Sequence, residues 1–424
     1  MCHFDNGFRY NANQLIENPS MNMLRLLLCV AVLATIPNTV KAQIAIDVIG
    51  GSEISFSGLI QTDMDWYGED GQNLSSDGND SDAQLRRAEL VLNGKGPGMW
   101  NWALGYDAYA NNFLDANVSY RTNVSTFVLG QYKQPNSLEE LSSTKNNDFM
   151  SMAMTTNLFA MGRRLGLGYA YTAQHWGAAA SYFGNELTPN QSPSLGTGYG
   201  WGTRAYYAPI NEQAHFLHLG LSYVDLEARN SSGQAQARLR TRPDADLADT
   251  RLIDTGDFSA DRLKVFGIES AYVQGPFKIQ AELMDNSVTR PDPYNDFNGS
   301  SYYVYGIWNL TGETWNYRNG LVVTPLPNDR NLGMWQVGVR YDNADLNDGL
   351  VTYADPSDPT VAQVTGILGG KEENWTIGMN WYWRSNFKIA LNYVMVNSSK
   401  YQSSENAVVE DNPEITTLRL QFYW

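Results

Sequence analysis

Cysteine and histidine are scarce in this chain. It has 2 Cys and 4 His among 424 residues, and both cysteines, Cys2 and Cys29, precede residue 43. The remaining segment therefore has neither a disulfide framework nor thiolate metal ligands. No nucleophile signature accompanies the three later histidines. An enzyme is consequently not expected, and neither is a metal or another cofactor.

Long apolar runs and excess positive charge are also missing. After residue 42 no run approaches the roughly 18 apolar residues that indicate a transmembrane helix. The mean hydropathy is −0.38, and 29 basic residues face 45 acidic ones, for a net charge of −16. These observations exclude a bundle of transmembrane helices. Because basic tracts are missing, nucleic acid is not an expected partner.

Residues 1–42 have the pattern of a secretory signal peptide. A basic residue precedes the apolar run Leu26–Leu33, and small residues close to position 42 offer a cleavage site. The polar stretch Met1–Ser20 is unusual in front of such a signal, which indicates a spurious extension and a true start at Met21 or Met23. The alternative is a buried N-terminal strand or helix.

Aromatic residues and strict alternation are abundant instead. The chain has 12 Trp, 25 Tyr and 37 Gly. In WNWALGYD, for example, Trp100, Trp102 and Leu104 alternate with smaller or polar residues. This period of two predicts strands with one apolar and one polar face. The predicted strands, sixteen in all, lie near 52–67, 83–95, 99–109, 112–121, 124–133, 162–173, 175–185, 199–208, 215–226, 261–274, 276–288, 301–311, 332–343, 372–382, 387–397 and 415–424.

The connections between these segments alternate in length. Short links such as TN and QGP alternate with long polar ones, which include 134–161, 227–260 and 344–371. Only the link 312–331 is long where the alternation requires a short one. A soluble sandwich gives no reason for this regularity, whereas an outer-membrane barrel does. We therefore predict that residues 43–424 form one all-β domain, a sixteen-stranded antiparallel transmembrane β-barrel with short periplasmic turns and long outer loops.

Three arginines occupy alternate positions in the sequence RLRTRPD. If the backbone there is extended, Arg238, Arg240 and Arg242 project to one side with a spacing of roughly 6–7 Å. Planar guanidinium groups bind oxyanions through paired hydrogen bonds. Two interpretations remain open. The arginines line a path for anions, or they pair with the acidic residues at 244, 246, 249 and 254 and order the loop.

Several stretches carry a resemblance to a known family. They are LRRAELVLNGK (85–95), GQYKQP (130–135), the stretch with RTRPDADL, FGIESAYVQGPFKIQAEL (266–283), LTGE (310–313), VRYDNADLNDG (339–349) and IGMNWYWRSNFKIALNYV (377–394). From Leu85 onward the chain thus resembles the phosphate-selective porin O and P family. The resemblance implies a sixteen-stranded channel that assembles as a homotrimer. It also implies an anion path lined by Arg86, Arg87, Asp115, Lys133, Arg238, Arg240 and Arg242.

Alternation refines two of these positions, and one departure weakens the resemblance. Arg87 shares the lumen side with Glu89. Arg86 is predicted on the outward face, at the end of its strand that is exposed to water. Where the family commonly has Glu-Arg after DFM, this chain has Ser151 and Met152. A methionine supplies no charge, so specific binding of phosphate is in doubt even if anions pass.

The expected function is passive diffusion of small anions, such as phosphate or pyrophosphate, across the outer membrane of a Gram-negative bacterium. The alternative is an unspecific or weakly cation-preferring porin, which the net charge and Met152 favour. The final strand, TTLRLQFYW, resembles the signal that the barrel-assembly machinery reads. Outer-membrane lipid and that machinery are accordingly the other expected partners.

Overall fold

The structure is a computed structural model. It describes residues 44–48, 52–68, 71, 74–187, 198–230, 232–355 and 358–424. The expected signal peptide at 1–42 lies outside the described residues.

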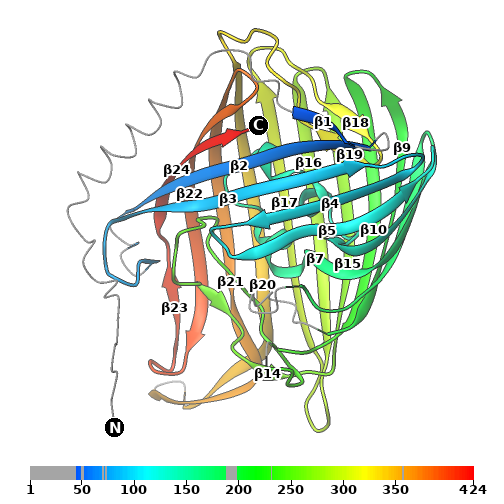
Figure 1. Ribbon diagram of the computed structural model, residues 1–424. Helices are drawn as coiled ribbons and strands as arrows, with labels where there is room; N and C mark the ends of the chain where they lie inside the picture. Colours follow the sequence, from blue (N-terminus) through cyan, green and yellow to red (C-terminus); the bar gives the residue numbers. More distant parts are fainter. Residues whose placement is uncertain are drawn as a thin grey trace, which may run out of the picture. The chain divides into compact units, whose positions relative to one another are not determined.

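The alternating segments form one closed antiparallel barrel (Figure 1). The sixteen barrel strands are β2 (Ser52–Tyr67), β3 (Ser81–Lys95), β4 (Trp100–Asp107), β5 (Asn112–Arg121), β6 (Ser125–Lys133), β7 (Arg163–Thr172), β8 (Trp176–Phe183), β9 (Gly200–Glu212), β10 (His215–Glu227), β15 (Arg262–Gln274), β16 (Phe277–Thr289), β17 (Phe297–Asn309), β20 (Met334–Asp355), β21 (Asp358–Trp383), β22 (Phe387–Gln402) and β24 (Glu414–Tyr423). Pairing between β2 and β24 closes the barrel. Two short strands, β1 (Ile44–Val48) and β23 (Ala407–Asp411), extend the sheet on β2 and β22. The predicted fold class is confirmed.

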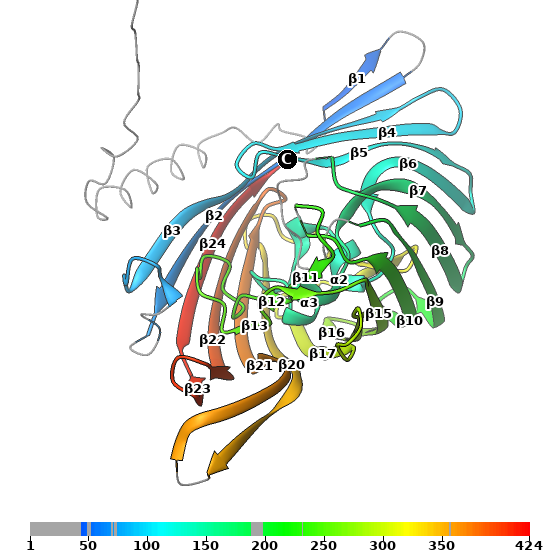
Figure 2. The ribbon, with the colours of Figure 1, turned by 90° about the horizontal axis from the view of Figure 1, so that it is seen from below.

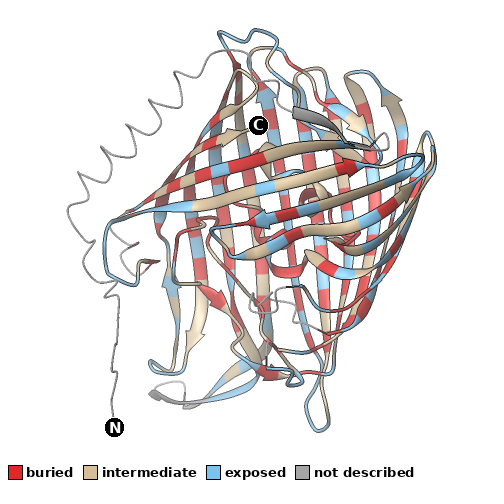
Figure 3. Ribbon diagram, viewed as in Figure 1, coloured by how far each residue is buried: buried red, intermediate tan, exposed pale blue. Residues whose placement is uncertain are grey.

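Along many of the barrel strands, and strictly along β17, burial alternates between the two faces (Figure 3). On β17, Ser301 and Tyr303 point inward and are buried, whereas Tyr302 and Val304 point outward and are 40% and 43% exposed. The sheet thus turns apolar side chains outward and polar ones inward, as membrane barrels do. Within the described part of the chain, no helix is long and apolar enough to cross a membrane.

The outward aromatic residues gather in two belts. One contains the Tyr341–Trp375 pair and the other the Trp335–Trp381 pair, with ring centroids 4.9 and 5.4 Å apart. Trp335 and Tyr341 lie six residues apart on β20, which corresponds to about 20 Å along the strand. This separation suits the apolar band of an outer-membrane barrel, which is about 25 Å tall.

One predicted loop is a pair of strands. The chain continues β20 and β21 through the link predicted at 344–371, with pairing that reaches Leu350↔Thr365 and Asp355↔Asp358. The prediction of a loop there was wrong, because polar outer residues masked a segment that still alternates and is rich in Val and Thr. The resulting hairpin extends beyond the neighbouring strands (Figure 2).

Three connections fold into the barrel, seen along its axis in Figure 2. We call residues 134–161 loop L3, which contains α2 (Leu138–Leu141), η2 (Thr144–Asn146) and α3 (Met154–Phe159). Loop L5, residues 228–261, forms two small ribbons, β11 (Gln236–Ala237) with β14 (Phe258–Ser259) and β12 (Arg240–Thr241) with β13 (Ile253–Asp254). The link that was unexpectedly long contains β18 (Asn316–Arg318) and β19 (Leu321–Val323). We call residues 310–333 the turn hairpin, since it starts from the side of the short turns.

Candidate functional site

Buried polar residues of the wall fix loop L3 inside the barrel. The carboxylate of Glu282 accepts hydrogen bonds from the backbone N–H groups of Leu138 and Glu139, at 3.1 and 2.7 Å. Lys278 forms an ion pair with Asp148, and both side chains are almost fully buried. Because an unpaired buried charge is costly, these pairs hold L3 in one position.

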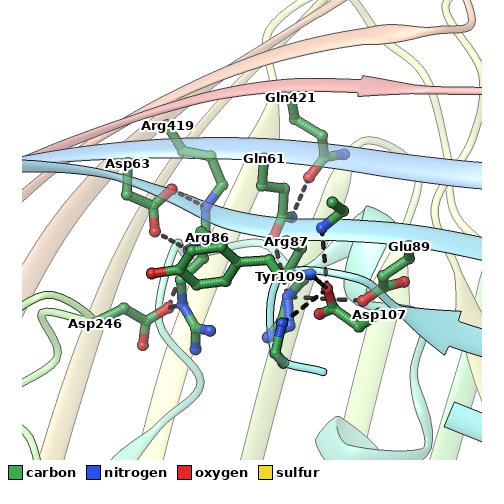
Figure 4. A network of polar contacts seen from close by, with 12 residues as sticks. Gln61, Asp63, Arg86, Arg87, Glu89, Asp107, Tyr109, Asp246, Arg419 and Gln421 are labelled. Atoms are coloured by element: carbon green, nitrogen blue, oxygen red, sulfur yellow. Dashed lines mark hydrogen bonds and ion pairs between the residues drawn. The ribbon is translucent and has the colours of Figure 1, made fainter. Parts of the chain in front are cut away.

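Two buried arginines clamp L3 and L5 to the wall together. Arg419 binds Asp63 of β2 at 2.5 and 2.7 Å, Asp246 of L5 at 2.9 Å and the Met150 carbonyl of L3 at 2.6 Å (Figure 4). Its side chain is 4% exposed. The lumen segments on this side of the barrel are therefore held by charge pairs removed from water.

Arg340 makes the corresponding contacts further along the wall. It binds Asp244 of L5 at 3.0 Å and Asp342 of its own strand at 2.5 Å, and donates to the Ser151 carbonyl of L3 at 2.9 Å. The guanidinium lies over the ring of Phe149, 4.8 Å from its centroid. Arg340 and Arg419 thus act as structural cations that join L3 and L5 to the wall.

A β-bulge turns both members of the arginine pair on β3 toward the lumen. The register of β2 with β3 passes from Gln61↔Arg87 directly to Thr62↔Leu85, so Arg86 is the extra residue. Its Nε donates to Asp246 at 3.2 Å. The predicted outward position of Arg86 was wrong, because a bulge breaks the alternation on which that prediction rests.

Arg87 keeps the lumen position that alternation predicted. Its Nε donates to the Gln61 side chain at 3.0 Å and lies 3.9 Å from Glu89. Figure 4 shows both arginines of the pair on the same side of β3, with Asp246 beside Arg86 and Glu89 beside Arg87.

The three arginines of L5 lie on one side of an extended segment, as predicted. They alternate with buried Leu239 and Thr241. Arg238 makes a two-pronged contact with Asp254 at 2.6 to 3.2 Å, and Arg240 lies 4.0 Å from the same carboxylate. Arg242 donates to the Ala248 carbonyl at 2.6 Å.

Acidic partners occupy part of this arginine row without covering it. Arg238 and Arg240 remain 38% and 34% exposed at their side chains. Although burial alone would raise the pKa of Asp254, the hydrogen bond from Arg238 lowers it below its usual range. The Arg238–Asp254 pair therefore stays ionised at neutral pH.

A fourth arginine, Arg251, lies just before the returning strand β13 of L5. Burial, together with the neighbouring charges of Arg242 and Arg240, lowers the pKa of Arg251 to about 10. Arg251 is therefore a fourth basic residue near the row, beside the acidic Asp254.

A cavity of about 620 Å³ lies beside L3 and is lined by L3, by the wall strands β3 to β7, β16 and β17, and by the turn hairpin. Its ionisable lining residues are the basic Arg121, Lys133, Lys145, Arg163 and Lys278 and the acidic Glu89, Asp115, Glu139 and Asp148. Five basic groups against four acidic ones give a net charge of +1, although the whole chain carries −16. The lining of this cavity therefore differs in sign from the protein as a whole.

Two of the predicted path residues, Lys133 and Asp115, lie at this cavity. Lys133 donates to the Glu140 carbonyl, which lies very close, and to the Ser142 carbonyl at 3.0 Å, so it also holds the end of α2. Asp115 binds Arg163 at 3.1 Å, with side chains 33% and 26% exposed. The seven predicted residues thus divide among this cavity, the β3 bulge and L5.

Residues 151 and 152 of L3, where the arginine expected from the resemblance is missing, lie where L3 contacts L5. Ser151 Oγ donates to Asp246 at 3.1 Å. Burial would raise the pKa of Asp246, but Arg86 and Arg419 outweigh it and hold the pKa below its usual range. L3 therefore contributes no arginine at 151 or 152 and instead binds an ionised aspartate of L5.

The turn hairpin reaches the lumen from the opposite end. Tyr317 Oη lies 2.6 Å from His218 Nδ1, whose Nε2 lies 2.9 Å from Glu269. Arg204 binds Glu269 at 2.5 Å and the Gly320 carbonyl at 2.9 Å. Residues 321–324 of the hairpin line the cavity beside L3.

Arg163, Lys145, Arg340 and Arg419 were not among the predicted site residues. For Arg163 and Arg419 a signal was present. Arg163 belongs to a second arginine pair at the start of a strand, like the pair at 86–87, and Arg419 lies on the polar face of TLRLQF. Lys145 sits in an irregular loop, where no periodicity indicates which side chains face the cavity.

A model of the family described as phosphate-selective porin O and P matches residues 56–424. Porin O of Pseudomonas aeruginosa is 26% identical over 424 residues, which cover 90% of this chain and 92% of that protein. An uncharacterised protein of Caulobacter vibrioides is 28% identical over 333 residues, covering 73% of this chain and 62% of that protein. The chain thus spans less than two thirds of the Caulobacter relative.

Solved structures resemble the barrel at low sequence identity. Outer-membrane expressed OmpT of Vibrio cholerae has a TM-score of 0.54 with 10% identity, covering 90% of this chain and 100% of that one. An anion-selective porin from Comamonas acidovorans has a TM-score of 0.52 with 14% identity, covering 88% and 100%. These likenesses concern the fold.

Proposed function

The chain belongs to the phosphate-selective porin O and P family, a family of Gram-negative outer-membrane channels, and we propose that it conducts small anions such as phosphate or pyrophosphate by passive diffusion. No residue performs chemistry on the solute. The selectivity is electrostatic and steric, because a few charges in a narrow lumen dominate the local field.

The observation that carries this proposal is the sign of the cavity lining. Basic groups outnumber acidic ones there, whereas the chain as a whole is strongly acidic. Acidic loops in bulk solvent act over only about 8 Å at physiological ionic strength. The field inside the lumen is therefore set by Lys133, Lys145 and Arg163 rather than by the net charge.

The arginine row of L5 supplies the approach to this cavity. An anion moves along donors that bind it strongly enough to enter and weakly enough to leave. Partial pairing of Arg238 and Arg240 with Asp254 weakens each donor and so favours release over tight binding. Of the seven residues expected on the path, we assign Arg87, Asp115 and Lys133 to the narrow part and the L5 row to the approach. Arg86, bound to Asp246, flanks the path.

An unspecific or weakly cation-preferring porin is the second candidate. It is favoured by the Asp115–Arg163 pair, which neutralises one cation of the narrow part, and by Ser151 and Met152, which add none. A wall of mixed sign conducts both ions, so this candidate predicts no dependence on phosphate.

Reversal potentials in a planar bilayer under a KCl gradient separate the two candidates. We expect an anion-selective potential, a chloride current that falls when phosphate is added to one side, and a weakening of both effects in Arg240→Ala. Arg330→Ala, in the connection on the turn side, removes the same charge away from L5 and serves as the control. A potential of zero or of cationic sign, unchanged by phosphate, would refute anion selectivity.

We also propose that the barrel assembles as a homotrimer and is inserted by the barrel-assembly machinery. A trimer form of Vibrio cholerae OmpT is among the solved structures of similar fold, with a TM-score of 0.53 and 10% identity. The last strand, β24, carries alternating apolar residues and ends next to Trp424. The mass of the detergent-solubilised protein, measured by light scattering, tests the trimer.

A further inference from the structure

A polar groove interrupts the outward face of the barrel near its long-loop end. It measures about 550 Å³ and is formed by β10, β15, β16, β17 and β20. Its lining includes Lys264, Asp285, Ser287 and Ser300, with Tyr223 and Phe266 beside them. It lies on the outside of the wall, so it is no part of the conduction path.

Strand pairing places these residues side by side. Lys264 lies opposite Ser287, and Asp285 lies opposite both Phe266 and Ser300. Among the described residues, no ion pair or side-chain hydrogen bond joins the Lys264 ammonium or the Asp285 carboxylate to the protein. The nearby Arg262, in contrast, is paired with Asp225 at 2.7 Å. One cation and one anion of the groove therefore keep their binding capacity.

The position of the groove along the barrel axis indicates which layer of the membrane surrounds it. Two register positions further toward the turns, the outward residues become Ile268, Leu283 and Tyr302, which are 46%, 37% and 40% exposed. Tyr302 contacts Tyr341 of the aromatic belt on that side, with ring centroids 6.0 Å apart. Aromatic belts lie at the level of the headgroups. The groove thus opens where lipid headgroups begin, with apolar surface for acyl chains directly beside it.

We propose that this groove binds the headgroup of a phosphorylated, acylated glycolipid of the outer leaflet. Lys264 pairs with a phosphate, since an ammonium group is a point charge suited to a phosphate oxygen. The Asp285 carboxylate accepts hydrogen bonds from sugar hydroxyls, and the hydroxyls of Ser287 and Ser300 both donate to them and accept from them. The acyl chains lie against the apolar residues toward the turns. The protein thereby binds its membrane at one defined place on the wall.

Native mass spectrometry of the detergent-purified protein tests this site with two probes, a bisphosphorylated hexa-acyl glucosamine disaccharide and its dephosphorylated form. Wild type should bind the phosphorylated probe at least about tenfold more tightly. Lys264→Ala should lose this preference and Lys264→Arg should keep it. Lys95→Ala, at a short turn on the opposite side, removes the same charge and should behave as wild type.

Three results would overturn the proposal. The first is equal binding of both probes by wild type, and the second is an unchanged preference for the phosphorylated probe in Lys264→Ala. The third is a loss of the oligomer in Lys264→Ala without a change in probe binding. That third result would assign the groove to contact with a second copy of the chain. Folding of each variant is checked by its heat-dependent mobility on a gel. Since the groove is outside the lumen, Lys264→Ala should leave the reversal potential unchanged, which separates this proposal from that of anion conduction.

Discussion

The two sides of the lumen use the same kind of residue in opposite ways. Where L3 and L5 meet the wall, Arg340 and Arg419 are 0% and 4% exposed, and carboxylates and carbonyls surround each of them. Across the cavity, Arg163 and Lys133 are 26% and 14% exposed and face an open volume. A buried, paired cation fixes structure, whereas a partly exposed one that faces a cavity keeps part of its field for a solute.

We expect the largest effect from the removal of a structural cation. Arg419→Met leaves Asp63 buried without its ion-pair partner and leaves Asp246 paired with Arg86 alone, so we expect a loss of about 3–5 kcal/mol in the free energy of unfolding. L3 and L5 should also loosen, which gives a larger and noisier single-channel conductance. Denaturant titration and bilayer recording measure the two effects.

Arg163→Met provides the matched change on the other side of the lumen. It should cost at most about 1 kcal/mol, because the Arg163–Asp115 pair is partly exposed. Equal losses of stability in the two variants would contradict the division into structural and conducting cations.

A second experiment separates the two charges of the exposed pair. Arg163→Gln should shift the reversal potential toward cations, because Asp115 then acts alone on the cavity. Asp115→Asn should shift it toward anions by a similar amount, and the double variant should lie close to wild type. A shift of the same sign in both single variants would show that the pair acts through the shape of the pore instead.

The sequence predicted the faces of some of these residues correctly and of others wrongly. Alternation located all sixteen strands, because one face of each strand contacts lipid and the other the lumen. It failed at Arg86, where an extra residue in β3 changes the face, and at 344–371, where polar outer residues resembled a loop.

The contacts that fix the lumen could not be predicted from the sequence. Arg419 and Asp246 are separated by 173 positions, and Glu282 and Leu138 by 144. Such pairs follow from the closure of the barrel and from the path of the inward loops. The L5 arginines were found because they follow the period of two, a local regularity that a single sequence displays.

A smaller effect is expected from pH. Burial lowers the pKa of Lys145 below that of an ordinary lysine, so its charge is lost at a lower pH than that of an ordinary lysine. As the pH rises, anion selectivity should therefore begin to decline before ordinary lysines titrate, at about pH 10.4. Lys145→Arg should flatten this decline in the reversal potential. The same decline in the variant would exclude Lys145 as its origin.

The most direct test of the central claim measures the local concentration of ions beside L3. Residues 43–424 contain no cysteine, so a cysteine introduced by Ser143→Cys, at an exposed position that lines the cavity, is the only thiol of the barrel. Its rates of modification by an anionic and a cationic methanethiosulfonate of similar size are followed through the current. Thr376→Cys, fully buried where L5 contacts the wall, serves as the unreactive control. The account predicts that the anionic reagent reacts at least about tenfold faster, relative to the rates of both reagents with a free thiol. An equal or faster reaction of the cationic reagent would contradict it.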